Sequence, residues 1–347
     1  MTRNAPIRVG VIGAGYWGSN LIRTLTTVPA ASLEVVCDAR VERLNDVAAR
    51  FGLATTRDTA AVLERRDIEA IFIATPAETH AEIARECLMA GKHVFVEKPM
   101  TTTVPAARLL SEVAMRSNRI LMVGHLFQYE RATQRLIELV REGAIGTIRY
   151  TRGVRTSMSG TARLDTDIVW DALIHDAYVQ AELFGRQPQR VLVVGAAYLR
   201  PPLSDVAFAT FDFGDRQIAH LSVGWYALEK TRTLLVVGSD GMLAYDGLSP
   251  TPLKRFARRY EESAEIDAYG RHYWRWIDSE GEVVPVTASE PLRTECEHFL
   301  HCVATGTQPM SDARSGARAV EIIDACSRSV AAGGAWEMTS TAVGACS

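Results

Sequence analysis

The chain lacks an excess of charge of either sign, and it lacks any long hydrophobic run. Its formal net charge is −3, from 38 basic and 41 acidic residues, so we expect no nucleic-acid partner. No apolar segment approaches the roughly 20 residues that a membrane-spanning helix needs, and no signal-peptide core follows residues 1–6. We therefore expect a cytoplasmic protein with no membrane partner.

Several catalytic and metal-binding motifs are also missing. The six cysteines are scattered without a C-x-x-C pair, which predicts reduced thiols and no disulfides. No serine lies in a G-x-S-x-G turn and no Walker lysine follows the glycines, so hydrolase and P-loop functions have no support. Cys296, His298, His301 and Cys302 share one predicted helix without the spacing of a zinc site, and we predict no metal.

The first part of the chain alternates short apolar runs with amphipathic segments. Strands are predicted at 7–12, 33–37, 70–74, 93–96 and 120–123, and helices at 17–27, 41–51, 58–65, 80–90 and 103–117. This alternation is typical of a parallel sheet covered on both faces. We therefore predict an α/β fold with a Rossmann dinucleotide-binding domain over residues 1–125.

After a predicted helix near 130–142, strands follow one another with little helix between them. They are predicted at 146–157, 190–198, 205–213, 216–225, 231–238 and 242–246, with helices at 168–184, 291–304 and 314–331. This succession predicts an α+β domain over residues 126–347 with a large, mostly antiparallel open sheet. The open face needs a cover, which another subunit would supply.

A glycine-rich turn, Gly13-Ala14-Gly15-Tyr16-Trp17-Gly18, links the first predicted strand to the first predicted helix. Such a turn brings backbone N–H groups and a positive helix end to a diphosphate. Asp38 ends the second predicted strand, 20 positions past Gly18, where a carboxylate accepts hydrogen bonds from ribose hydroxyls. We predict that NAD binds at Gly13, Gly15, Tyr16, Trp17, Gly18 and Asp38. Arg40 keeps NADP as the alternative, because an arginine there would pair with a 2′-phosphate.

Other polar residues follow the remaining strands of this domain, at the edge where parallel sheets bind ligands. Glu97-Lys98-Pro99 comes directly after the fourth strand, and we predict that Lys98 hydrogen-bonds a substrate hydroxyl and shares its proton. A solvated lysine in a turn is the alternative. The further candidate cofactor contacts are Thr75, Pro76, His80, Glu97, Lys98 and His125. For His80, capping and loop packing are the alternative roles.

The helix that opens the second domain carries a carboxylate and an imidazole four residues apart, Asp171 and His175. On one helix face the carboxylate would fix the tautomer of His175 and raise its basicity, which suits a general base. A surface ion pair is the alternative reading, and Asp176 is expected to be structural. The candidate substrate contacts are Arg155, Arg163 and Tyr178.

Taken together, these residues resemble the Gfo/Idh/MocA family of NAD(P)-dependent oxidoreductases. The matching stretches are VGVIGAGYWGSNLIR at 9–23, ATPAETHAEIARECLMAGKHVFVEKPM at 74–100, VGHLFQY at 123–129, DALIH at 171–175 and SDARSG at 311–316. The resemblance implies a Rossmann domain followed by a C-terminal domain whose open sheet packs in a homodimer or homotetramer. It also implies Lys98 beside the nicotinamide, His175 as the acid and base, and Asp171 in its helix.

The resemblance is strongest to the branch that oxidises or reduces C3 of UDP- or TDP-linked sugars. The helix lacks the glycine-rich approach of the inositol-dehydrogenase branch, which makes inositol less favoured. We expect hydride transfer between a nicotinamide and a CH–OH or C=O carbon of a sugar or nucleotide-linked sugar. The alternatives are a reductase of an imine or enone in a natural-product pathway, a non-catalytic dinucleotide-binding regulator, and a structural protein that keeps the fold.

Overall fold

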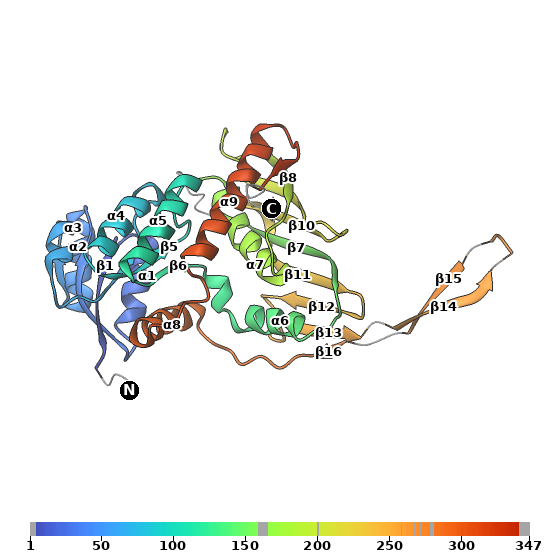
Figure 1. The fold of residues 1–347 in the computed structure, drawn as a ribbon, viewed down its shortest axis with the longest axis horizontal. Coiled ribbons are helices and arrows are strands. Elements are labelled where there is room, and N and C mark those ends of the chain that lie inside the picture. Colours follow the sequence, from blue (N-terminus) through green and yellow to red (C-terminus); the bar gives the residue numbers. More distant parts are fainter. Residues whose placement is uncertain are drawn as a thin grey trace. The chain divides into compact units, whose positions relative to one another are not determined.

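The computed structural model describes residues 5–158, 166–199, 201–257, 259–266, 268–270, 272–277 and 281–339 (Figure 1). The chain divides into two compact units. Unit 1 comprises Met1–Glu130 and Ser289–Asp324, and unit 2 comprises Arg131–Ala288 and Ala325–Ser347. The predicted division into 1–125 and 126–347 therefore differs from this one chiefly at residues 289–324, which belong to unit 1.

Unit 1 is built on a six-stranded sheet in which all neighbouring strands run parallel, in the order β3-β2-β1-β4-β5-β6. The strands are β1 (Ile7–Ile12), β2 (Ala31–Cys37), β3 (Ala54–Thr56), β4 (Ala70–Ile73), β5 (His93–Glu97) and β6 (Leu121–Gly124). Strands β4, β5 and β6 are buried almost throughout, as expected for strands covered on both faces. The order reverses between β1 and β4, which is where such sheets bind ligands beyond the strand ends.

The helices of unit 1 follow the strands with short connections. They are α1 (Tyr16–Leu25), α2 (Val41–Phe51), α3 (Thr59–Glu64), α4 (Ala77–Met89) and α5 (Val104–Ser117), with a 3-10 turn η1 (Leu126–Tyr129) after β6. The side chain of Thr103 caps α5 by accepting a hydrogen bond from the N–H of Ala106, and Asn118 ends it with φ of 52°. No side chain caps α1, so the N–H groups of its first turn remain available to a ligand.

Helix α8 (Pro291–Thr305) completes the core of unit 1, although it lies far along the chain. The ring of Phe299 packs edge-on against Phe72 of β4 at 5.1 Å and against Phe95 of β5 at 5.9 Å. The turn before α9 (Ala313–Ala331) is tied to β6, because the N–H of Val123 donates to the carbonyl of Ser311 at 2.8 Å. These contacts give the physical reason why residues 289–324 fold with the first half of the chain.

Unit 2 contains a nine-stranded sheet in the order β16-β13-β12-β11-β7-β10-β9-β8-β17. The strands are β7 (Ile148–Met158), β8 (Arg190–Ala196), β9 (Val206–Asp212), β10 (Ile218–Gly224), β11 (Tyr226–Gly238), β12 (Gly241–Asp246), β13 (Leu253–Ala257), β16 (Glu282–Val283) and β17 (Glu337–Met338). β7 and β10 pair in parallel and the other neighbours pair antiparallel. The predicted α/β class with a mostly antiparallel second sheet is confirmed.

The other elements of unit 2 are α6 (Arg131–Arg141), a π-helical turn η2 (Val169–Leu173), α7 (Ile174–Phe184) and a hairpin of β14 (Arg259–Ile266) and β15 (His272–Ile277), which forms a two-stranded sheet of its own. Buried residues of α6 and α7, among them Leu136 and Leu183, share one apolar cluster with Val236 and Leu243 of the sheet. One face of the large sheet is therefore covered by helices. On the other face lie two exposed apolar pairs, Tyr150 opposite Ile218 and Val194 opposite Phe208, which are offset from each other by four residues along β10.

Candidate active site

The turn between β1 and α1 is packed so tightly that two of its glycines have no room for a side chain. Gly13 has a φ of +100°, and a Cβ there would lie 2.5 Å from the carbonyl oxygen of Ala74. A Cβ on Gly18 would lie 1.9 Å from the carbonyl oxygen of Gly13. The uncapped helix end and this bare backbone form a cradle suited to a diphosphate, with Tyr16 largely exposed beside it. The residues present therefore fit a dinucleotide.

Asp38 follows β2 as a buried and ionised carboxylate. Its Oδ2 accepts hydrogen bonds from the N–H of Ala14 at 2.7 Å and from Nη1 of Arg43 at 3.2 Å, and its Oδ1 accepts one from the N–H of Arg40 at 2.8 Å. Burial acts to raise the pKa of Asp38, but these donors outweigh it and hold the pKa below its usual value. A carboxylate offers about four acceptor positions, so capacity remains on Oδ1 for a ribose hydroxyl.

The loop after β4 is joined to the turn after β5 by a buried histidine. Nε2 of His80 lies 2.9 Å from the carbonyl oxygen of Thr75, and Nδ1 lies 2.8 Å from that of Pro99. Both partners are acceptors, so a ring that satisfies both contacts must donate from both nitrogens. His80 thus contacts backbone at two cofactor-edge loops, which matches the predicted packing role more than a direct ligand contact. Thr75 is half-buried and Pro76 is exposed in the same loop.

Glu97, Lys98 and His125 lie at the carboxyl ends of β5 and β6, which are paired in register at Glu97 and Gly124. All three side chains are buried, with 8%, 8% and 2% exposed. Burial, together with the nearby charge of Lys98, lowers the pKa of His125 to about 3, so this imidazole is neutral at physiological pH. The structure therefore gathers the glycine turn, Asp38, Lys98 and His125 on one edge of the unit 1 sheet.

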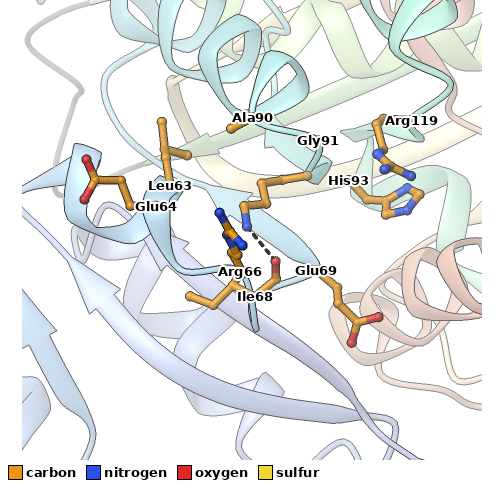
Figure 2. Close-up of a pocket in the computed structure, with 10 residues that line it drawn as sticks. Leu63, Glu64, Arg66, Ile68, Glu69, Ala90, Gly91, His93 and Arg119 are labelled. Atoms are coloured by element: carbon orange, nitrogen blue, oxygen red, sulfur yellow. Dashed lines mark hydrogen bonds between the residues drawn. The ribbon is translucent and has the colours of Figure 1, made fainter.

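A hollow of about 580 Å³ lies on the opposite, amino-terminal edge of the same sheet (Figure 2). Arg66, His93 and Arg119 surround it, and Lys92 donates to the carbonyl oxygens of Arg65 and Ile68 at 2.6 and 2.9 Å. Burial and the charge of Arg119 lower the pKa of His93 to about 4, and its Nδ1 accepts the N–H of Ile120. Lys92 is hydrogen-bonded to backbone carbonyl groups of the protein itself, so we do not assign the cofactor to this hollow.

In unit 2, Asp171 and His175 lie on either side of a change in helix type. Asp171 is in the π-helical turn η2, whereas His175 is in the first turn of α7. Asp167 opens η2, because its Oδ1 accepts the N–H groups of Val169 and Trp170 at 3.1 Å each. The uniform α-helical spacing predicted for the two residues is therefore interrupted between them. Single π turns inside helices are frequent at functional sites.

Two of the three candidate substrate residues, Arg155 and Tyr178, lie among the described residues, and their environments differ. Arg155 of β7 forms a bidentate ion pair with Asp176 of α7, at 2.7 and 2.9 Å, which gives Asp176 the structural role expected for it. Tyr178 is only 3% exposed, which leaves little of its surface for a ligand. Arg163 lies outside the described residues.

Three residues were not found from the sequence: Arg43 and Glu295 in unit 1, and Asp167 in unit 2. Arg43 follows Asp38 by five residues, and its proximity to an acidic residue was the one available signal. Within the described part of the chain, no three or more His, Cys, Asp or Glu side chains gather as a metal site would require. Among the same residues, no helix is long and apolar enough to span a membrane.

Known proteins match the chain over both units. Residues 7–125 match the family described as an oxidoreductase family with an NAD-binding Rossmann fold, and residues 133–244 match the GFO/IDH/MocA C-terminal domain. UDP-N-acetylglucosamine 3-dehydrogenase from Acidithiobacillus ferrooxidans is 27% identical over 312 residues, which cover 90% of this chain and 93% of that protein. A solved structure of that dehydrogenase superposes with a TM-score of 0.82 and 26% identity, covering 94% and 99% of the two chains.

Two further relatives have different named substrates. Inositol 2-dehydrogenase 2 from Saccharopolyspora erythraea is 27% identical over 330 residues, covering 87% of this chain and 94% of that protein. A dTDP-3,4-didehydro-2,6-dideoxy-alpha-D-glucose 3-reductase from Actinomadura kijaniata is 36% identical over 173 residues, covering 49% and 52%. With its parallel sheet, its glycine turn and matches over both units, the chain belongs to the Gfo/Idh/MocA family of oxidoreductases with an NAD-binding Rossmann fold.

Proposed function

We propose that this oxidoreductase interconverts a CH–OH and a C=O group at C3 of a nucleotide-linked sugar. The observation that carries the proposal is Lys98, buried at the end of β5 on the same sheet edge as the glycine turn and Asp38. A regulator that only binds the dinucleotide has no need of a buried lysine at that position. The sugar and its C3 carbon are supported by the named activities of the dehydrogenase and the 3-reductase relatives.

Each residue has a defined task in the proposed reaction. The bound nicotinamide supplies or accepts the hydride. In oxidation, His175 takes the proton of the substrate hydroxyl, and Asp171 favours the imidazolium that forms. Lys98 donates a hydrogen bond to the same oxygen and shares its proton. Gly15 and Gly18 bind the diphosphate through backbone N–H groups, whereas the N–H of Gly13 already donates to the carbonyl oxygen of Cys37 at 2.7 Å and Gly13 serves to shape the turn. Asp38 accepts hydrogen bonds from the ribose hydroxyls.

A substrate panel tests this function. Reduction of NAD is measured with UDP-N-acetylglucosamine, a dTDP-linked hexose and myo-inositol, and oxidation of NADH is measured with a cyclic imine, both at the absorbance band of reduced nicotinamide. We expect turnover with at least one nucleotide-linked sugar and a 3-keto product by NMR. Turnover of the imine or of myo-inositol alone would contradict the proposal, and binding of neither NAD nor NADH would indicate a structural protein.

NADH should bind at least about tenfold more tightly than NADPH, which corresponds to about 1.4 kcal/mol. The ionised Asp38 carboxylate repels a 2′-phosphate, and Arg43 is already engaged by that carboxylate at 3.2 Å. Asp38→Ser should remove most of the preference, whereas Arg116→Ala on the exposed surface of α5 serves as a control. Titration calorimetry measures both affinities. A preference of the wild type for NADPH would show that Arg40 and Arg43 pair with the phosphate.

We also propose that the exposed face of the unit 2 sheet packs against a second copy of the chain. Two apolar pairs, Tyr150 with Ile218 and Val194 with Phe208, are exposed on that face, and monomeric proteins rarely expose extended apolar surface. A molar mass in solution equal to that of one chain would contradict this packing.

The five described cysteines are free and buried, which is compatible with the cytoplasmic location we propose.

A further inference from the structure

Helix α8 carries one carboxyl group on a face that is otherwise apolar. Glu295 is 1% exposed, and its neighbours Leu292, Cys296 and Phe299 are buried in the core of unit 1. Among the described residues, no donor lies within hydrogen-bonding distance of Oε1 of Glu295. An ionised carboxylate in such surroundings would be very costly, because burial removes its hydration without replacing it. Glu295 therefore needs a specific explanation.

The packing of Phe299 against Phe95 brings Glu295 toward the face of β5 that carries Glu97. Phe95 and Glu97 are two residues apart in β5, so their side chains lie on the same face of the strand. Both approach the backbone of Gly124, because a Cβ on Gly124 would lie 3.1 Å from Cζ of Phe95 and 3.1 Å from Oε2 of Glu97. Phe299 contacts the ring of Phe95 at 5.9 Å. Glu295 precedes Phe299 by one helical turn and so shares its face of α8.

The electrostatics agree with this placement. Burial, and then the charge of Glu97, raise the pKa of Glu295 well above its usual range. Two carboxyl groups that lie close together in a buried site cannot both ionise, because the second charge is repelled by the first. Glu97 lies at the more exposed edge, with 8% of its surface accessible against 1% for Glu295. The proton of the pair therefore resides mainly on Glu295.

We propose that Glu295 is a positioning residue: a neutral carboxylic acid that shares its proton with the carboxylate of Glu97 and thereby fixes the strand end that carries Lys98. No proton leaves the pair during the reaction, and no redox change occurs in it. With one proton between them, the two carboxyl groups present a single negative charge next to Lys98. The positioning of Lys98 for catalysis rests on the proposed function, whereas the shared proton does not.

Infrared spectroscopy tests the shared proton without any substrate. A protonated carboxylic acid has a C=O stretch that is separate from the carboxylate bands, so we compare the wild type with Glu295→Gln at pH 8. Glu297→Gln is the matched control, because Glu297 lies on the same helix, is 46% exposed and pairs with Arg293 at 2.8 Å. We expect the protonated-acid band in the wild type and in Glu297→Gln and its loss in Glu295→Gln. An unchanged band in Glu295→Gln would overturn the proposal.

Kinetics test the positioning role. Glu295→Gln keeps a donor for the Glu97 carboxylate, so its kcat should remain within about threefold of the wild type. Glu295→Met fills a similar volume without a donor and should lower kcat by at least about tenfold, since small misplacements of catalytic groups have large effects. NADH affinity should change by less than about threefold in both. Wild-type kcat in Glu295→Met would reject the positioning role.

These two experiments separate the failure of this inference from failure of the proposed function. If no sugar is turned over, the infrared comparison still decides whether Glu295 holds the proton. If Glu295→Met does not fold, the presence or absence of the protonated-acid band in Glu295→Gln still tests the shared proton. If the band is lost but kcat is as low in Glu295→Gln as in Glu295→Met, a donor at this position is insufficient and the positioning role is rejected.

Discussion

His175→Ala and Lys98→Ala should each lower turnover of the nucleotide-linked sugar by about 10²- to 10⁴-fold, the usual contribution of a positioned proton-transfer group. Neither side chain belongs to the glycine turn or to Asp38, so the affinity for NADH should change by less than about threefold. Steady-state kinetics and NADH titration measure the two quantities separately. A large fall in kcat with unchanged NADH binding is the signature of groups that act on the reacting oxygen.

Matched controls are available for both variants. His301 is an exposed histidine of α8, and Lys254 is an exposed lysine of β13, so His301→Ala and Lys254→Ala should leave turnover unchanged. Lys98→Arg refines the assignment, because an arginine donates hydrogen bonds but cannot give up its proton. If Lys98 shares a proton, Lys98→Arg should be nearly as slow as Lys98→Ala. Normal turnover in both His175→Ala and Lys98→Ala would refute the catalytic roles.

The sequence predicted the elements of unit 1 well, because its strands are short apolar runs separated by amphipathic helices. The observed β1, α2 and β5 begin at the predicted residues, and the other main elements of that sheet begin within three residues of theirs. β3 escaped prediction because Ala54–Thr56 has only three residues, too few for a periodic pattern. The packing of α8 against the unit 1 sheet was not predicted for another reason: the contacts of Phe299 join residues about 200 positions apart in the sequence.

Unit 2 was predicted less completely, because its later strands are polar. β13 has the sequence Leu-Lys-Arg-Phe-Ala, whose charges conceal the strand, and β16 and β17 have two residues each. β11 begins at Tyr226, five residues before the predicted start, since its first part is rich in charge. The π turn was not predicted either, because the sequence pattern does not show the two hydrogen bonds that Asp167 accepts from the backbone N–H groups of Val169 and Trp170 at its start.

The candidate site was predicted where motifs mark strand ends and missed where only the fold brings residues together. Gly13, Gly18 and Asp38 follow from their positions after β1 and β2, and the structure shows the steric reason for both glycines. His80 was predicted as a candidate cofactor contact, with capping and loop packing as the alternative roles, and its two ring nitrogens lie within hydrogen-bonding distance of the carbonyl oxygens of Pro99 and Thr75. Glu295 has no motif at all, since its meaning comes from Glu97 on a strand distant in the sequence.

Gly18→Ala should lower the free energy of unfolding by about 2–3 kcal/mol and abolish NADH binding. Within a helix, this change would ordinarily stabilise by about 0.5–1 kcal/mol. Here the added Cβ would lie 1.9 Å from the carbonyl oxygen of Gly13, a backbone atom that cannot move aside alone. Gly13 itself is confined, because its own Cβ position is 2.5 Å from the carbonyl oxygen of Ala74. The clash therefore displaces the whole turn, and overpacking of this kind costs about 1–3 kcal/mol or more.

Gly15→Ala is the matched variant, because Gly15 lies in the same turn with ordinary geometry. Its φ is −70°, and a Cβ there would be 3.5 Å from Nη1 of Arg43, a normal contact with a flexible side chain. Its free energy of unfolding, from urea denaturation, should therefore change by less than about 0.5 kcal/mol. NADH should nevertheless bind more weakly, because the diphosphate must approach this backbone closely. Equal stability of the two variants would contradict the steric account of Gly18, whereas wild-type NADH affinity in Gly15→Ala would place the diphosphate elsewhere.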